Sequence, residues 1–118
     1  MRVHHLVLRS PDPAALAVFY TGALGLPERR RADDAEGLFS VWLDIGETIL
    51  MIERGQRRSR DEGWDGLFVT AAAGSGEGWL TSWAGVGIAA EGRTTYTLYA
   101  RDPDGNRFGV SSFPQGLF

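Results

Sequence analysis

The sequence contains neither cysteine nor lysine, and the two absences remove whole classes of chemistry. Without cysteine, the chain has no disulfide, thiolate nucleophile, iron–sulfur cluster or cysteine-based zinc site. Without lysine, it has no Schiff-base chemistry, no attachment point for pyridoxal phosphate and no lysine for a phosphate-binding loop. All 12 basic residues are therefore arginine, and any catalysis must use other groups.

Long apolar runs are also missing. No segment approaches the roughly 18 apolar residues that would span a bilayer, and the stretch from Met1 to His5 contains no apolar signal core. The net charge of -3 argues against nucleic-acid binding, although seven arginines gather at 29–31 and 54–60. We expect a cytoplasmic protein with no membrane partner and no nucleic-acid partner, and we interpret the two arginine clusters as solvated loops.

The chain has 118 residues, of which 43% are hydrophobic and 23% are charged. This size and composition predict a single soluble domain over residues 1–118. Its pattern divides into two modules, at about 1–55 and 64–118. The stretch at about 54–63 is charged and flanked by glycine, which is typical of a solvated linker.

Both halves show the same order of strand and helix signals. Asp12 and Pro13 predict the start of a helix that ends at Gly25. A similar helix signal in the second half ends at Gly85, and the matching spacing indicates an internal duplication. The predicted elements are strands at 3–9, 27–32, 38–45 and 47–53 around a helix at 13–24, and strands at 66–71, 86–91, 94–101 and 107–113 around a helix at 77–84.

Three motifs occur together at one spacing. They are His5-x-x-Leu8-x-x-x-Asp12, Phe19-Tyr20-x-x-x-Leu24-Gly25-Leu26 and Arg101-Asp102-Pro103-Asp104-Gly105-Asn106-Arg107-Phe108. Jointly they resemble the vicinal oxygen chelate superfamily, which includes glyoxalase I, bleomycin resistance proteins, fosfomycin resistance transferases and extradiol dioxygenases. The resemblance implies an α+β fold in which two βαβββ modules form an open curved mixed sheet, or cup, usually within a homodimer.

The resemblance also implies a divalent metal site, but the sequence departs from the family pattern there. His5 stands at the first ligand position, and the second falls on Met51 or Glu53. The third and fourth positions match Gly66 and Gly109, which carry no ligating side chain. We therefore expect no metal ion and no other cofactor.

Strand alternation predicts which side chains line the cup. In the first strand, Leu6 and Leu8 suit the helix side, which leaves His5 on the other face. The same rule directs Leu50 and Ile52 inward in the fourth strand. The candidate ligand-binding residues are His5, Trp42, Met51, Glu53, Thr97, Tyr99 and Arg101.

This lining combines aromatic rings, a thioether, a hydroxyl and a few charges, which is the profile of a pocket for an organic ligand. The first hypothesis is a metal-free protein that binds or sequesters a small organic molecule. The second is a lyase, isomerase or dioxygenase of the glyoxalase type, with an atypical metal site or with His5 and Glu53 as an acid–base pair. The third is a structural or regulatory dimer with a vestigial cup. We expect a homodimer in each case.

Overall fold

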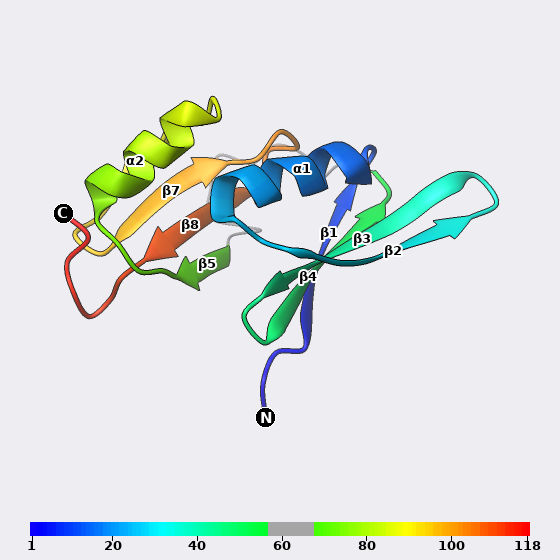
Figure 1. Cartoon of the computed structure of the whole chain (residues 1–118), viewed down its shortest axis with the longest axis horizontal. Coiled ribbons are helices and arrows are strands. Elements are labelled where there is room, and N and C mark those ends of the chain that lie inside the picture. Colours follow the sequence, from blue (N-terminus) through cyan, green and yellow to red (C-terminus); the bar gives the residue numbers. More distant parts are fainter. Residues whose placement is uncertain (57–67) are drawn as a thin grey trace. The chain divides into compact units, whose positions relative to one another are not determined.

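The computed structural model describes residues 1–56 and 68–118 (Figure 1). The chain divides into two compact units, Met1–Ser59 and Arg60–Phe118. The first unit contains β1 (His5–Ser10), α1 (Pro13–Leu24), β2 (Glu28–Asp34), β3 (Gly37–Ile45) and β4 (Thr48–Arg54). The second contains β5 (Phe68–Ala71), α2 (Gly76–Gly85), β6 (Gly92–Arg93), β7 (Thr97–Arg101) and β8 (Arg107–Ser111).

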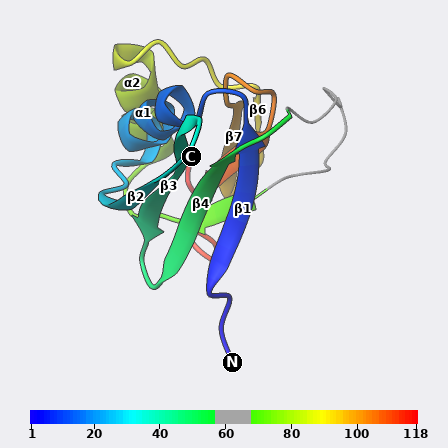
Figure 2. The ribbon, with the colours of Figure 1, turned by 90° about the vertical axis from the view of Figure 1, so that its right-hand side faces the viewer.

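Each unit has one mixed sheet of four strands. The strand order is β1-β4-β3-β2 in the first sheet, as Figure 2 shows, and β5-β8-β7-β6 in the second. The first strand of each unit runs parallel to its neighbour, and the other pairs are antiparallel. The predicted α+β fold of two βαβββ modules is therefore confirmed.

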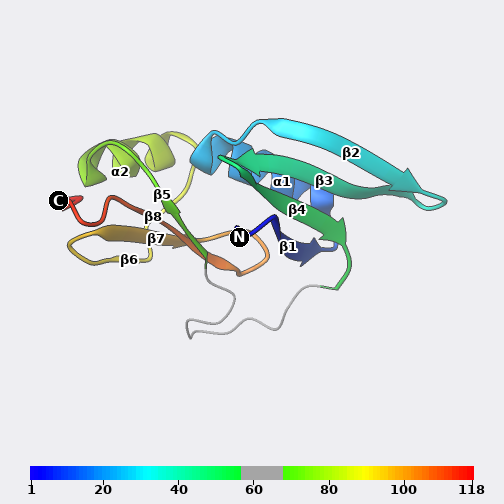
Figure 3. The ribbon, with the colours of Figure 1, turned by 90° about the horizontal axis from the view of Figure 1, so that it is seen from below.

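Helix α1 forms where the capping residues predict it. The Asp12 side chain accepts a hydrogen bond from the Ala15 N–H at 3.1 Å, and Pro13 occupies the first turn. At the other end, Gly25 adopts a φ of 67° and donates its N–H to Thr21, which closes the helix. The helix packs mainly on β3 and β4, so one face of the first sheet is covered (Figures 1 and 3).

The core of each unit lies between its helix and its sheet. In the first unit, Leu16 and Tyr20 of α1 are buried, as are four residues of β3 and β4: Val41, Leu43, Leu50 and Ile52. In the second unit, Trp83 of α2 lies 5.4 Å from Phe108 between ring centroids. Its sheet residues in the core are Leu98, Ala100, Phe108 and Val110. The inward packing predicted for Leu50 and Ile52 is confirmed.

The strand predicted at 86–91 is wrong. Val86 and Ile88 alternate like strand residues, but the N–H groups of both donate to the carbonyl of Trp83 and close helix α2. Gly87 allows this turn because its φ is 78°. Strand β6 consists only of Gly92 and Arg93.

The strand predicted at 94–101 begins three residues late. The Thr94 hydroxyl accepts the N–H groups of Tyr96 and Thr97. This local turn competes with strand pairing, so β7 starts only at Thr97.

Leu6 also departs from its prediction. Strand alternation predicts that Leu6 packs toward the helix, yet it is 36% exposed. Strand β1 lies at the edge of its sheet, and α1 sits over β3 and β4 instead. Most of the predicted linker, from 57 to 63, lies outside the described residues, as does Gly66.

Candidate functional site

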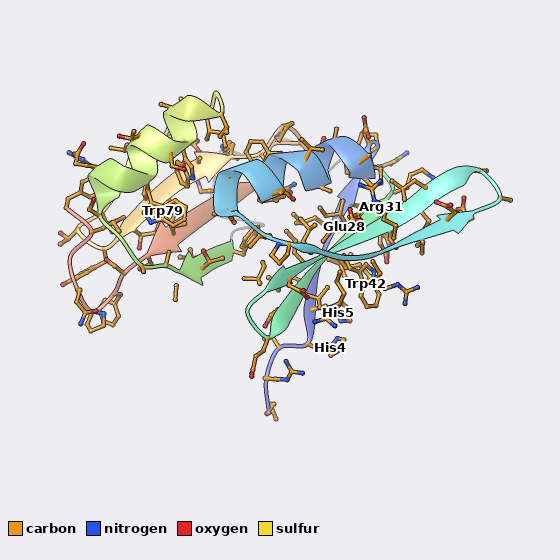
Figure 4. All side chains as sticks on the ribbon, in the orientation of Figure 1. His4, His5, Glu28, Arg31, Trp42 and Trp79 are labelled. Atoms are coloured by element: carbon orange, nitrogen blue, oxygen red, sulfur yellow. The ribbon has the colours of Figure 1, made fainter. Side chains whose placement is uncertain are left out.

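The first open face is the face of the first sheet that is turned away from α1. Strand pairing arranges its residues in three rows across β1, β4 and β3. Figure 4 shows Trp42 and His5 projecting on the side opposite α1. The rows are His5–Ile49–Asp44, Val7–Met51–Trp42 and Arg9–Glu53–Ser40.

The rows bring some predicted site residues together and separate others. Met51 and Trp42 are direct cross-strand neighbours and both are half-buried. His5 and Glu53 stand in the outer rows, because His5 pairs with Ile49, which lies four residues from Glu53 on β4, or about 13 Å along the strand. Direct proton transfer between His5 and Glu53 is therefore ruled out by this register. A hollow of about 420 Å³ lies beside Glu53, lined by Val7, Leu8, Arg9, Glu53 and Gln56.

Trp42 has a cationic neighbour on the edge strand. A register shift between Glu28 and Arg30 in β2 places Arg30 across from Trp42. The guanidinium carbon of Arg30 lies 4.9 Å from the centroid of the indole ring. This contact is a cation–π interaction.

The second open face is the face of the second sheet that is turned away from the buried Leu98, Ala100, Phe108 and Val110. Its rows are Ala71–Ser111–Thr97, Val69–Gly109–Tyr99 and the pair Arg107–Arg101. Thr97 is buried, and Tyr99 and Arg101 are half-buried. The three predicted residues of this module thus lie consecutively along one face of β7.

A charged cluster lies at one end of the second open face. Arg101 donates from Nε to Glu91 Oε1 at 2.8 Å, and Arg107 donates from Nε to Glu91 Oε2 at 3.3 Å. Arg101 also donates to the carbonyl of Gly105 at 2.9 Å. Burial alone would raise the pKa of Glu91, but the hydrogen bonds from Arg101 and Arg107 outweigh it and hold the pKa below its usual range. The guanidinium of the predicted residue Arg101 is therefore held by Glu91 and Gly105.

Gly109 stands at the fourth ligand position, where the resemblance implies a glutamate. A Cβ at this position would lie 3.0 Å from the Tyr99 ring and 3.0 Å from the Leu98 carbonyl oxygen. Tyr99 is the cross-strand partner of Gly109, so its ring covers the glycine. Aromatic surface thus occupies the space that a ligating side chain would need.

The described residues do not fit a metal ion of the family type. Within 1–56 and 68–118, no group of three or more His, Asp or Glu side chains is placed to hold one. His5 is near only one other imidazole, with its Nδ1 2.9 Å from Nδ1 of His4. A divalent ion on this scaffold needs three or four ligands, and the described side chains do not supply them.

Sequence reasoning missed two residues of these faces. Arg30 was interpreted as part of a solvated loop, because its position depends on a strand irregularity that the sequence does not show. Glu91 was placed in a strand that does not form. Its sequence signal is an acidic residue that precedes two strands which each carry an arginine.

Comparisons with known proteins agree with the fold. The lactoylglutathione lyase structure from Agrobacterium tumefaciens has a TM-score of 0.71 and 21% identity, and covers 93% of this chain and 92% of its own. The fosfomycin resistance protein FosX from Listeria monocytogenes has a TM-score of 0.76 and 15% identity, and the match covers 94% of this chain and 91% of FosX. That structure is of an E126Q mutant with Mn(II) and 1S,2S-dihydroxypropylphosphonic acid. A virulence protein from Salmonella typhimurium has a TM-score of 0.69 and 19% identity, covering 94% and 95%.

No curated protein matches the chain significantly. In the part of the chain that the structure describes, no helix is long and apolar enough to cross a membrane. The sequence model of the Glyoxalase/Bleomycin resistance protein/Dioxygenase superfamily matches residues 2–73, which is more than half of the chain. Together with the fold, this match shows that the chain belongs to that superfamily.

Proposed function

We propose that this protein binds or sequesters a small organic molecule on its open faces without a metal ion. The observation that carries the proposal is the packing of Tyr99 over Gly109. A family-type ligand at position 109 would need the space that the ring fills. The ring instead offers a flat apolar surface, which suits an organic ligand.

The internal duplication supports this interpretation. The row Val7–Met51–Trp42 has the same strand positions as the row Val69–Gly109–Tyr99. Each row thus places a valine, a residue without a ligating oxygen or nitrogen, and an aromatic ring side by side. Each module then has an aromatic ring paired with a position, 51 or 109, at which the resemblance implies a metal ligand.

Fluorescence titration with a panel of flat aromatic compounds tests the binding surface. We expect Trp42→Phe and Tyr99→Ala to weaken a ligand found with the unmodified protein. Each ring contact contributes about 0.5–1.5 kcal/mol beyond the area it buries, so Tyr99→Ala should weaken binding about two- to twelvefold. Trp42→Phe keeps a smaller ring and should weaken binding by less. Trp79→Phe is the matched control, since Trp79 lies on α2 and donates its indole N–H to Ala73. A ligand whose affinity changes in neither test variant contradicts the proposed surface.

Elemental analysis tests the absence of metal. We expect no stoichiometric divalent ion in the purified protein and no rise in Tm with Ni, Zn, Mn or Fe salts, because a bound ion would stabilise the folded state by mass action. About one ion per chain that is lost in His5→Ala would overturn the metal-free proposal.

An enzyme of the glyoxalase type is the second candidate. It is favoured by the similarity to a lactoylglutathione lyase and to FosX, which was solved with Mn(II). The separation of His5 from Glu53 removes the acid–base pair, so this function would need an ion at an atypical site. Turnover of lactoylglutathione or fosfomycin by the protein after loading with Ni, Zn, Mn or Fe would favour the enzyme over the binding protein.

A further inference from the structure

Three consecutive arginines in β2 have partners of two kinds. Arg29 donates from Nε to Asp44 at 2.6 Å, and Arg31 donates from Nε to Glu28 at 2.8 Å. Arg30, between them, lies over the indole ring of Trp42. Within the described ranges, no carboxylate forms an ion pair with Arg30. The three arginines therefore do not form a uniformly solvated cluster.

The alternation of the strand separates Arg30 from its neighbour Arg31. Arg30 pairs with Trp42, which lies on the first open face, whereas Arg31 pairs with Val41, which is buried on the helix side. In Figure 4, Arg31 lies near α1 and Trp42 lies on the other side of the sheet. Only one arginine of this adjacent pair can therefore touch a molecule bound against Trp42.

Stacking on an indole leaves the donors of a guanidinium available. The contact uses the flat face of the group, while its five N–H donors point outward in the plane. A planar carboxylate beside the indole would meet two of these donors in a fork, with shorter and stronger bonds than a neutral acceptor makes. Arg30 and Trp42 together thus present a flat ring surface with a donor edge.

The carboxylates on this face leave Arg30 as the arginine that a ligand can pair with. Among the described residues, Arg9, Arg29 and Arg30 reach the first open face, and the register places Asp33, Asp44 and Glu53 there as well. Asp44 is bonded to Arg29, whereas no ion pair joins Arg30 to a carboxylate of the described residues, so this one guanidinium favours one carboxylate on the ligand. We propose, resting on the function proposed above, that the ligand is a flat aromatic molecule with one carboxylate, and that Arg30 is the residue that selects for the carboxylate.

Calorimetry with naphthoate and its neutral amide tests this selection, because the two probes share the ring and differ in charge. At physiological ionic strength, we expect the unmodified protein to bind naphthoate about tenfold more tightly than the amide, as a charge-assisted hydrogen bond would provide. Arg30→Gln should reduce this preference to about twofold or less. Arg31→Gln changes the net charge equally and should leave the preference unchanged.

The outcomes separate this inference from the proposed function. Equal binding of both probes by the unmodified protein overturns the selection but leaves an organic-ligand site standing. An equal loss of preference in Arg31→Gln also overturns it, since general attraction would then be the cause. Arg30→Lys is the second variant, and it should keep only part of the preference because it lacks the planar fork. If neither probe binds, the selection is wrong, and the proposed function fails with it only if the fluorescence panel also finds no ligand.

Discussion

Arg54, the last residue of β4, reaches across the first sheet and donates a hydrogen bond to Asp34 at the end of β2. The same guanidinium donates to the carbonyl of Leu38 at 2.8 Å, so one side chain holds both strands of the β2–β3 hairpin. The tip of this hairpin is exposed. Its position therefore depends on an ion pair rather than on burial.

This ion pair makes the stability of the first unit pH-dependent. The hydrogen bond from Arg54, with the backbone N–H of Glu36, lowers the pKa of Asp34 below its ordinary value of 3.8. A lowered pKa in the folded state contributes stability above pH 3.8 that is lost as the pH falls through the folded value. We expect Asp34→Asn to have a lower Tm than the unmodified protein at pH 7, and the gap to close in acid. Thermal unfolding from pH 7 to about pH 2 measures it, and a gap that widens in acid contradicts the assignment.

Glu91 should matter more for stability, because its partners are largely buried. The side chains of Arg101 and Arg107 are only 16% and 13% exposed, and Glu91 is bonded to both. Glu91→Gln leaves two partly desolvated cations without their shared carboxylate, which costs about 1–3 kcal/mol. Urea unfolding at neutral pH measures this cost. Glu47→Gln, at an exposed turn, is the control and should change stability by less than about 0.5 kcal/mol.

The sequence was sufficient where structure follows from local rules. Asp12, Pro13 and Gly25 fixed the bounds of α1 through capping, and alternation placed Trp42 and Tyr99 on faces turned away from the helices. The sequence was insufficient where the structure depends on contacts between different segments of the chain. Alternation could not show that α1 leaves Leu6 uncovered, and no local signal revealed the register shift that sets Arg30 beside Trp42.

The exposed edge of the first sheet supports the expected homodimer. Val3, Leu6 and Val7 are all more than a third exposed, and β1 pairs on one side only. An apolar edge strand favours association, and a small chain gains buried area by pairing with a second copy. We expect light scattering to show a dimer at micromolar concentration and Leu6→Glu to shift it toward monomer. A monomer in the unmodified protein would contradict the prediction.

The pairing of Gly109 with Tyr99 gives the sharpest test of the site itself. Gly109→Ala places a Cβ 3.0 Å from both the Tyr99 ring and the Leu98 carbonyl oxygen, so the strand or the ring must shift at a cost of about 1–3 kcal/mol. Gly92→Ala on β6 is the control, because nothing lies within 4 Å of its Cβ. Restoring the family residue with Gly109→Glu should lower stability in the same way and bind no Mn or Zn. Urea unfolding and elemental analysis of the three variants measure both effects. A Gly109→Glu protein of unchanged stability that holds one ion per chain would contradict this prediction. It would mean that the Tyr99 ring moves aside and that the metal site can be restored.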